Sequence, residues 1–176
     1  MPREEIELKF PVSQPRVLRA RIRALGFRVA VARRLERNWI FDDAMGGLRR
    51  QGCLLRLRQS GRQWRLTAKG PRLPGPLKRR REAETPVADG PACRELLAVL
   101  GFRAQLSYQR HRTVLRRPGS AGGELDWDDT PLGSYLEIEG GAAWVRRTTR
   151  ELGLALGAAE PRSYPELYAA AGRAGV

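Results

Sequence analysis

Histidine, cysteine and long apolar stretches are nearly absent from this sequence. His111 is the one histidine, so a Ser-His-Asp catalytic set could form only around that residue. Cys53 and Cys93 are too few for a disulfide framework or a thiolate metal site, and we expect two ordinary buried thiols. No apolar run approaches the ~18 residues of a membrane helix, and the first residues are charged, so neither membrane insertion nor secretion is indicated. We therefore expect a cytoplasmic protein.

Lysine is also rare, although the chain is strongly basic. Lysine and arginine together number 33 against 19 acidic residues, which gives a formal net charge of +14. An excess of this size suits a polyanionic partner. Only Lys9, Lys69 and Lys78 are lysines, and the other cations are arginines. With 176 residues, of which 41% are hydrophobic, the chain fits one domain over residues 1–176.

Pairs of glutamates two residues apart occur three times. In the stretch 5–10 (EIELKF), the two glutamates and the lysine share one face of a strand, and the apolar residues share the other. The same spacing recurs at 82–84 (EAE) and 137–139 (EIE). A helix-like stretch that ends at Leu-Gly follows each pair. The chain therefore contains three copies of one unit, a charged strand followed by a helix.

Apolar periodicity and turn residues predict the remaining elements of an α+β fold. Helices are expected at 15–25, 91–100, 142–152 and around 165–173. Nine extended segments are expected, around 5–10, 27–32, 37–41, 54–58, 64–69, 78–84, 106–115, 124–128 and 134–139. They make up about eight strands, nearly all antiparallel. Glycine or proline is frequent at 42–47, 70–76 and 118–123, which are expected to be turns and loops.

Most of the predicted strands carry alternating charges on one face. In a packed core each unpaired ion would cost several kcal/mol, whereas a charged face turned to solvent would imply no function. We favour a closed barrel with a hydrated, charged interior and with apolar faces directed outward beneath the helices. The predicted interior acids are Glu5, Glu7, Glu82, Glu84, Asp128, Glu137 and Glu139. The predicted interior bases are Lys9, Arg56, Arg58, Lys69, Arg80, Arg110 and Arg112.

This mixture of charges indicates a metal bound to phosphate. Clustered carboxylates repel one another unless a cation joins them, and hard oxygen ligands select Mg²⁺ or Mn²⁺ over zinc. Arginine and lysine on the opposite wall would neutralise the remaining phosphate charge, arginine through its two-pronged guanidinium and lysine as a point charge. A chain of phosphates across the interior satisfies both halves of the set.

The motifs also resemble a known family. The stretch 5–9 (EIELK) is similar to the ExExK signature of the CYTH domain, the triphosphate tunnel metalloenzyme superfamily, which includes class IV adenylate cyclases, thiamine triphosphatases and inorganic triphosphatases. Further stretches that resemble the family's strand motifs, in the family's order, are 55–58 (LRLR), 67–71 (TAKGP), Arg80 with Glu82 and Glu84, 110–112 (RHR), Asp128 before 130–133 (TPLG), and 137–139 (EIE). The resemblance spans nearly the whole chain. It implies a closed eight-stranded antiparallel β-barrel with helices packed outside.

The resemblance also implies roles for the interior residues. Metal ligands would be Glu5, Glu7, Asp128, Glu137 and Glu139, and Asp126 shares the parity of Asp128, so either aspartate can face the metal. Substrate-binding residues would be Lys9, Arg56, Arg58, Lys69, Arg80, Arg110 and Arg112, of which Lys9, Arg56, Arg58 and Lys69 would also act in catalysis. Glu82 and Glu84 would orient these bases or support a second metal. The tail around Ser163 and Tyr164 resembles a segment that packs near the tunnel mouth.

The implied activity is Mg²⁺- or Mn²⁺-dependent chemistry on a small-molecule triphosphate, by a monomer or homodimer. Hydrolysis of a nucleoside, thiamine or inorganic triphosphate is favoured over the alternative, cyclisation of ATP to cyclic AMP and pyrophosphate, because no adenine pocket can be read from the residues. A further alternative is a non-catalytic module that binds polyphosphate, or RNA through the outer basic surface. Seven interior carboxylates argue against that module, since an anion binder gains nothing from them.

Overall fold

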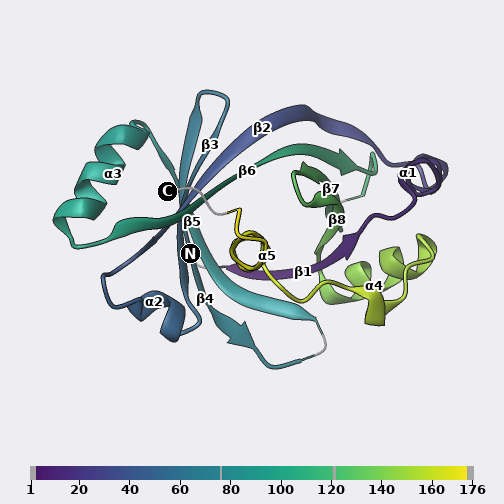
Figure 1. Ribbon diagram of the computed structural model, residues 1–176. Helices are drawn as coiled ribbons and strands as arrows, with labels where there is room; N and C mark the ends of the chain where they lie inside the picture. Colours follow the sequence, from purple (N-terminus) through teal and green to yellow (C-terminus); the bar gives the residue numbers. More distant parts are fainter. Residues whose placement is uncertain (1–2, 76, 121, 174–176) are drawn as a thin grey trace.

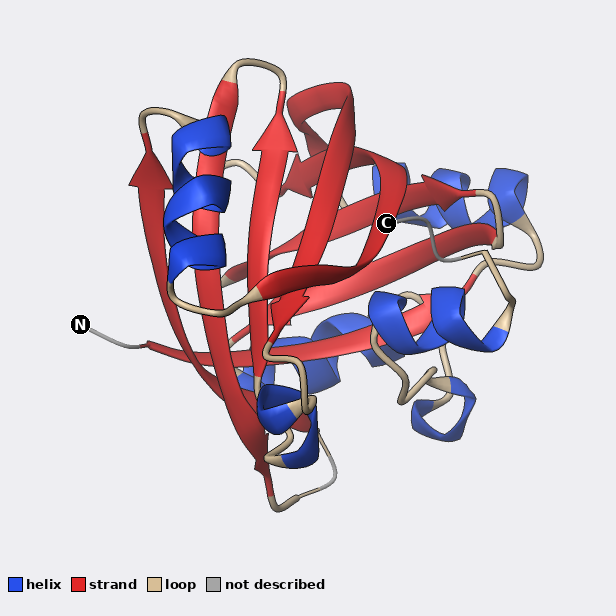
Figure 2. Cartoon of the chain, turned by 60° about the vertical axis from the view of Figure 1, so that its left-hand side comes forward, coloured by secondary structure: helices blue, strands red, loops and turns tan. Residues whose placement is uncertain are grey.

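Eight antiparallel strands of the described chain close into a barrel. The structure is a computed structural model in which residues 3–75, 77–120 and 122–173 are described. Around the ring the strand order is β1-β5-β4-β3-β2-β6-β7-β8, and β8 pairs with β1 to close it. The expected fold class, a closed eight-stranded α+β barrel with helices outside, is confirmed. Figure 2 shows helices on the outside of the barrel.

The elements follow one another with short connections. The strands are β1 (Arg3–Pro11), β2 (Arg28–Asp42), β3 (Leu54–Ser60), β4 (Gln63–Leu73), β5 (Lys78–Val87), β6 (Arg103–Arg116), β7 (Gly123–Thr130) and β8 (Gly133–Gly140). The helices are α1 (Pro15–Ala24), α2 (Gly47–Arg50), α3 (Gly90–Val99), α4 (Ala142–Glu151), the 3₁₀ turn η1 (Leu156–Ala158) and α5 (Tyr164–Ala170). The three charged-strand-and-helix units of the sequence are β1–α1, β5–α3 and β8–α4. Their strands are neighbours in the ring, because β1 pairs with both β5 and β8.

The hydrophobic core lies outside the barrel wall. Phe10 of β1 and Ile138 of β8 are directed outward and are almost completely buried. They pack in one cluster with Ile22 of α1 and Val145 of α4. Because successive side chains of a strand point to opposite faces, this outward apolar layer leaves the charged positions of the same strands inside the ring.

Removing an outward core side chain should therefore destabilise the protein although it touches no charged group. Ile138 is 0% exposed, and we expect Ile138→Ala to lower the free energy of unfolding by about 3 kcal/mol, the usual cost of truncating a buried isoleucine. Urea denaturation measures this loss. The control Val29→Ala, at a position 60% exposed, should change it by less than about 0.5 kcal/mol. If the Ile138→Ala protein were as stable as the wild type, Ile138 would not belong to the hydrophobic core.

Two other helices pack at different places on the barrel, α3 on its outer face and α5 at its opening. Leu97 of α3 packs on Phe41 of β2 and Leu57 of β3 in a second cluster. α5 lies in the opening of the barrel (Figure 1). There Tyr164 and Tyr168 pack against Tyr108 of β6, in a third cluster that also contains Leu167 and Tyr135.

Three features differ from the sequence-based expectations. β2 is one continuous strand with register irregularities, where separate strands at 27–32 and 37–41 were expected. The loop expected at 70–76 is wrong in its first half, because β4 continues to Leu73 after a register shift. The four-residue α2 was not anticipated, since so short a helix shows no periodicity. Residues 76 and 121, inside two of the expected loops, lie outside the described residues.

The two cysteines and the lengths of the helices can also be compared with what the sequence predicts. Both cysteines are free, as expected, but each is partly exposed instead of buried. Within the described ranges, no helix combines the length and the apolar character that a membrane crossing requires.

Candidate functional site

The interior of the barrel is a charged cavity of about 500 Å³. Eleven cationic side chains and eight carboxylates line it, so the described lining carries an excess of positive charge. The cationic side chains are Lys9, Arg34, Arg56, Arg58, Arg65, Lys69, Lys78, Arg80, Arg110, Arg112 and Arg116. The carboxylates are those of Glu5, Glu7, Glu82, Glu84, Glu124, Asp126, Glu137 and Glu139.

The two signs of charge occupy different walls. The neighbouring strands β7, β8 and β1 carry most of the lining carboxylates. The neighbouring strands β4, β3, β2 and β6 carry most of the cations, and β5 carries both signs between β4 and β1. A ligand in the cavity therefore meets carboxylates on one side and guanidinium groups on the other.

The structure brings together thirteen of the fourteen charged residues expected in the interior. The exception is Asp128, which is 0% exposed and lies behind the cavity surface. Its carboxylate accepts hydrogen bonds from Arg110 at 3.0 Å, from Arg112 at 2.7 Å and from the Tyr164 hydroxyl at 2.7 Å. Asp128 thus anchors two arginines of the cationic wall. Of the two aspartates considered on β7, Asp126 is the one that lines the cavity.

Several cations of the cavity have no close carboxylate partner. Among the described residues, no carboxylate oxygen lies within ion-pair distance of Arg34, Arg56 or Arg80, and the Nε atom of each is buried without a hydrogen-bond partner. The Lys9 ammonium is 3.9 Å from Glu137, and burial lowers the pKa of Lys9 to about 8. Arg56 and Lys9 are buried, whereas Arg34 and Arg80 are half-buried. Buried cations with weak or missing partners are costly, so these groups are suited to an anion that enters the cavity.

The carboxylates of β1 are already paired with lysines. Glu5 accepts a hydrogen bond from Lys69 at 2.6 Å, and Lys69 also lies 3.0 Å from Glu82. Burial nevertheless raises the pKa of Glu5 to about 7, and the charge of Glu7 adds to that rise. Glu7 pairs with Lys78. Burial alone would raise the pKa of Glu7, but the nearby lysines outweigh it and lower the pKa.

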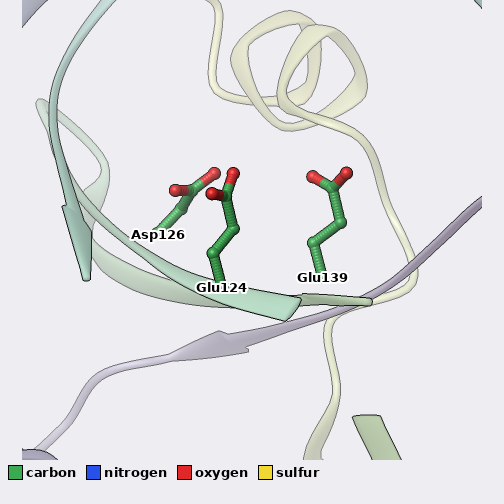
Figure 3. Close-up of side chains that lie close together, drawn as sticks. All are labelled: Glu124, Asp126 and Glu139. Atoms are coloured by element: carbon green, nitrogen blue, oxygen red, sulfur yellow. The ribbon is translucent and has the colours of Figure 1, made fainter. Parts of the chain in front are cut away.

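A second set of carboxylates comes together on β7 and β8. Glu124, Asp126 and Glu139 each offer an oxygen within 4.8 Å of the others. Figure 3 shows the three side chains rising from adjacent strands toward one space. The Oδ1 atom of Asp126 is buried and has no hydrogen-bond partner among the described residues. An all-carboxylate set with an orphaned oxygen fits a hard divalent cation such as Mg²⁺ or Mn²⁺.

Several interior residues were not identified from the sequence. On β2, Arg34 lines the cavity, while Glu36 and Asn38 are fully buried beneath it. Glu36 accepts a hydrogen bond from Arg110 at 3.0 Å, and neither polar atom of the Asn38 amide has a hydrogen-bond partner in the part of the chain that the structure describes. The sequence did contain a signal, because Arg34, Glu36 and Asn38 are spaced two residues apart and the neighbouring Trp39 points outward. Lys78 likewise continues the alternation of β5.

Tyr164 of α5 is a further interior residue. Its ring lies 4.0 Å from the Lys9 ammonium and 4.8 Å from the Arg110 guanidinium, measured to the ring centroid. Burial raises the pKa of the Tyr164 hydroxyl, and the charge of Asp128 raises it further. The aromatic ring thus contacts two of the cations that face the cavity. The sequence offered only a position in a tail, with no alternation to show that Tyr164 points inward.

Comparison with known proteins gives one family and several similar folds. A family model described as the CYTH domain matches residues 3–161. A Vibrio parahaemolyticus protein proposed to be an adenylate cyclase superposes with a TM-score of 0.83 at 19% identity, covering 96% of this chain and 99% of that one. A Pyrococcus horikoshii OT3 protein gives a TM-score of 0.79 at 24% identity, covering 95% and 99%.

A third similar structure has a described activity. It is a Hippeastrum protein proposed as an adenylyl cyclase and reported to have a dominant triphosphatase activity, and it gives a TM-score of 0.70 at 18% identity, covering 97% of this chain and 96% of that one. At these identities the structures show a shared fold. The search of curated proteins gives no match.

Proposed function

The chain belongs to the CYTH domain family, and on that premise we propose that it is a divalent-metal-dependent triphosphatase whose substrate lies in the charged cavity. The observation that carries this proposal is the division of the cavity into a carboxylate wall and a guanidinium wall. A metal ion needs the first wall and phosphate oxygens need the second. The excess of cations in the lining suits a metal-bound triphosphate, which retains negative charge.

The cationic wall would bind and orient the phosphates. Arg56, Arg34 and Arg80 have no carboxylate partner within ion-pair distance among the described residues, so a phosphate oxygen can pair with them without displacing an existing ion pair. Arg110 and Arg112 are held in place by Asp128, which fixes the direction of their guanidinium groups. Fixed donors of this kind stabilise charge that develops during phosphoryl transfer, since they need no reorganisation.

The carboxylate wall would hold the metal. Its oxygens come from β1, β7 and β8, and the expected ligands Glu5, Glu7, Glu137 and Glu139 all line the cavity. A bound divalent ion would polarise the phosphate oxygens and neutralise part of their charge. Lys9, which lines the cavity with its ammonium 3.9 Å from Glu137, would contact the substrate as a point charge.

Hydrolysis is the reaction that we favour. The attacking group would be water. The described lining has nineteen charged residues and only four apolar or aromatic ones, Leu54, Tyr108, Tyr164 and Pro165, which suits phosphates better than a nucleobase. Cyclisation of ATP is the second candidate, and the names of similar structures favour it in part. The Hippeastrum protein, with its dominant triphosphatase activity, supports hydrolysis within this fold.

Product analysis separates the candidates. With tripolyphosphate or ATP and Mg²⁺ or Mn²⁺, we expect release of inorganic phosphate, and EDTA should reduce the rate at least about a hundredfold because the metal supplies charge stabilisation that the residues alone do not. Phosphate and nucleotides are measured by colorimetry and chromatography. Cyclic AMP with pyrophosphate would establish the cyclase instead. Tight binding of tripolyphosphate in EDTA, with no turnover after metal is added, would indicate a binding module.

A further inference from the structure

We infer that the outer face of α3 is an interface through which two copies of this chain form a two-fold symmetric dimer. The interface lies on the outside of the barrel, so the inference does not depend on the triphosphatase activity proposed above. Three features support it: the exposed apolar side chains of α3, the charges beside them, and the distance between α3 and the most basic helices.

Three large apolar side chains are exposed together on α3 and its C-terminal cap. The exposed fractions are 59% for Leu96, 88% for Val99 and 64% for Leu100. Val99 and Leu100 follow Leu96 by three and four positions, so the three side chains form one stripe on a helix. A contiguous apolar patch on a protein surface marks a place where another molecule binds. The other exposed large apolar side chains of the described residues are separate from one another in the sequence: Val17, Val29, Met45 and Leu156.

The opposite face of α3 holds the helix on the barrel. Leu97 is buried and packs with Phe41 and Leu57. Asp89 caps the first turn by accepting a hydrogen bond from the backbone N–H of Ala92 at 2.9 Å. The stripe is thus presented on a helix that is already formed, and pairing requires little further ordering of the backbone.

The distribution of charge favours α3 as the contact between copies. Residues 89–103 contain two acidic and two basic side chains, so this segment is neutral in a chain of net charge +14. In contrast, α1 and α4 together contain seven arginines and one glutamate. They lie at the other end of the molecule from α3 (Figure 1). Two copies that meet at α3 therefore keep their most basic helices far apart, where salt screens the repulsion.

The charges beside the stripe are complementary between two copies. Glu95 precedes the stripe, Arg103 follows it at the start of β6, and both are exposed. Neither side chain has a hydrogen-bond or ion-pair partner among the described residues. In a two-fold interface both copies use the same surface. If the two stripes cross in opposite directions at Val99, Glu95 of each copy lies opposite Arg103 of the other, because each is four positions from Val99.

This self-complementarity selects the partner. An apolar stripe with an acid at one end and a base at the other matches a second copy of itself, whereas nothing in it selects a strongly charged partner. The stripe is small compared with the ~800 Å² that each partner buries in a typical stable interface. We therefore expect a weak dimer, with a dissociation constant of about 10–100 µM.

Sedimentation velocity of the full chain over about 1–500 µM, a range that spans the expected dissociation constant, tests the inference without reference to turnover. The average mass should rise from the 19.8 kDa of one chain toward twice that value as the concentration increases. Val99→Glu places like charges together at the centre of the pair and should weaken association at least about tenfold. Val29→Glu, at a position 60% exposed and outside α3, should leave the dissociation constant unchanged.

Exchange of the flanking charges tests the two-fold pairing itself. Glu95→Arg and Arg103→Glu should each weaken association about threefold or more, because each variant replaces two attractive contacts by repulsive ones. The double variant Glu95→Arg/Arg103→Glu exchanges the two charges and should restore the wild-type dissociation constant. All these positions are exposed, so every variant should keep the thermal midpoint of the wild type, which circular dichroism measures.

Three results would overturn the inference. The first is a wild-type protein that stays monomeric over the whole concentration range. The second is a Val99→Glu protein that dimerises as the wild type does. The third is weakening by both single charge substitutions with no recovery in the double variant, which would contradict the pairing around Val99. None of these results bears on hydrolysis of triphosphates, so failure of this inference and failure of the proposed function are distinguishable.

Discussion

Replacing Arg56 by alanine should lower kcat/KM for tripolyphosphate by about two to three orders of magnitude, the usual loss when one fixed donor to a developing charge is removed. Arg56 is 9% exposed, and its hydrogen bond to Thr67, at 3.5 Å, is long. No carboxylate of the described residues lies within ion-pair distance, so this guanidinium is free to bind phosphate. Steady-state kinetics with a phosphate assay measures the change.

Two further variants sharpen the Arg56 experiment. Arg56→Lys keeps the charge but loses the two-pronged geometry, and it should recover only part of the activity. Arg37→Ala removes an exposed arginine from the outer face of the adjacent strand β2 and should leave kcat/KM unchanged. Wild-type kcat/KM in a folded Arg56→Ala protein would remove Arg56 from the substrate site.

Replacing Asp128 by alanine should lower the free energy of unfolding by about 3–5 kcal/mol, because three buried donors, on Arg110, Arg112 and Tyr164, lose an acceptor at about 1–3 kcal/mol each. The remaining ion pairs of the two arginines with Glu36, Asp126 and Glu137 offset part of that loss. Asp128 is 0% exposed and accepts hydrogen bonds from both arginines and from Tyr164. For a chain of this length the loss corresponds to a thermal midpoint lower by about 10 °C or more. Calorimetry and urea denaturation measure the two quantities.

The Asp128 variant also separates an anchoring role from metal binding. Glu4→Ala, which removes one side of an exposed pair with Arg79, should change stability by less than about 1 kcal/mol and serves as the control. If Asp128→Ala kept the stability of the wild type but lost affinity for Mn²⁺, Asp128 would be a metal ligand, as the sequence led us to expect, and not an anchor for arginines.

The alternation of charge in the strands was the most informative signal in the sequence. It predicted the barrel and the inward direction of Glu5, Arg56 and Glu137, because a period of two leaves only two faces and the apolar one must pack under the helices. The same rule could not separate Asp126 from Asp128. Both point inward, and only the position of Arg110 and Tyr164 decides which of them is covered.

Local irregularities limited the prediction of the rest. In β2 the register irregularities interrupt the alternation between Val29 and Arg34, so the strand looked like two, and the inward Glu36 was overlooked. Glycine and proline after Lys69 suggested a loop, yet the strand β4 continues to Leu73 after a register shift in its pairing with β5. The resemblance placed the tail around Tyr164 near the tunnel mouth, but the contacts of this side chain with Lys9 and Arg110 could not be predicted, since they depend on how α5 docks into the barrel opening and not on any local pattern.

The pairing of β1 with β8 has a consequence for biosynthesis. The two strands that complete the ring are far apart in sequence, so the ring of backbone hydrogen bonds cannot form until residue 140 has left the ribosome. Until then the nascent chain exposes an unpaired edge and an outer apolar layer to other proteins. Chaperone dependence during translation, and recovery of the native barrel only after release of a chain that includes β8, would be the cellular signature of this closure.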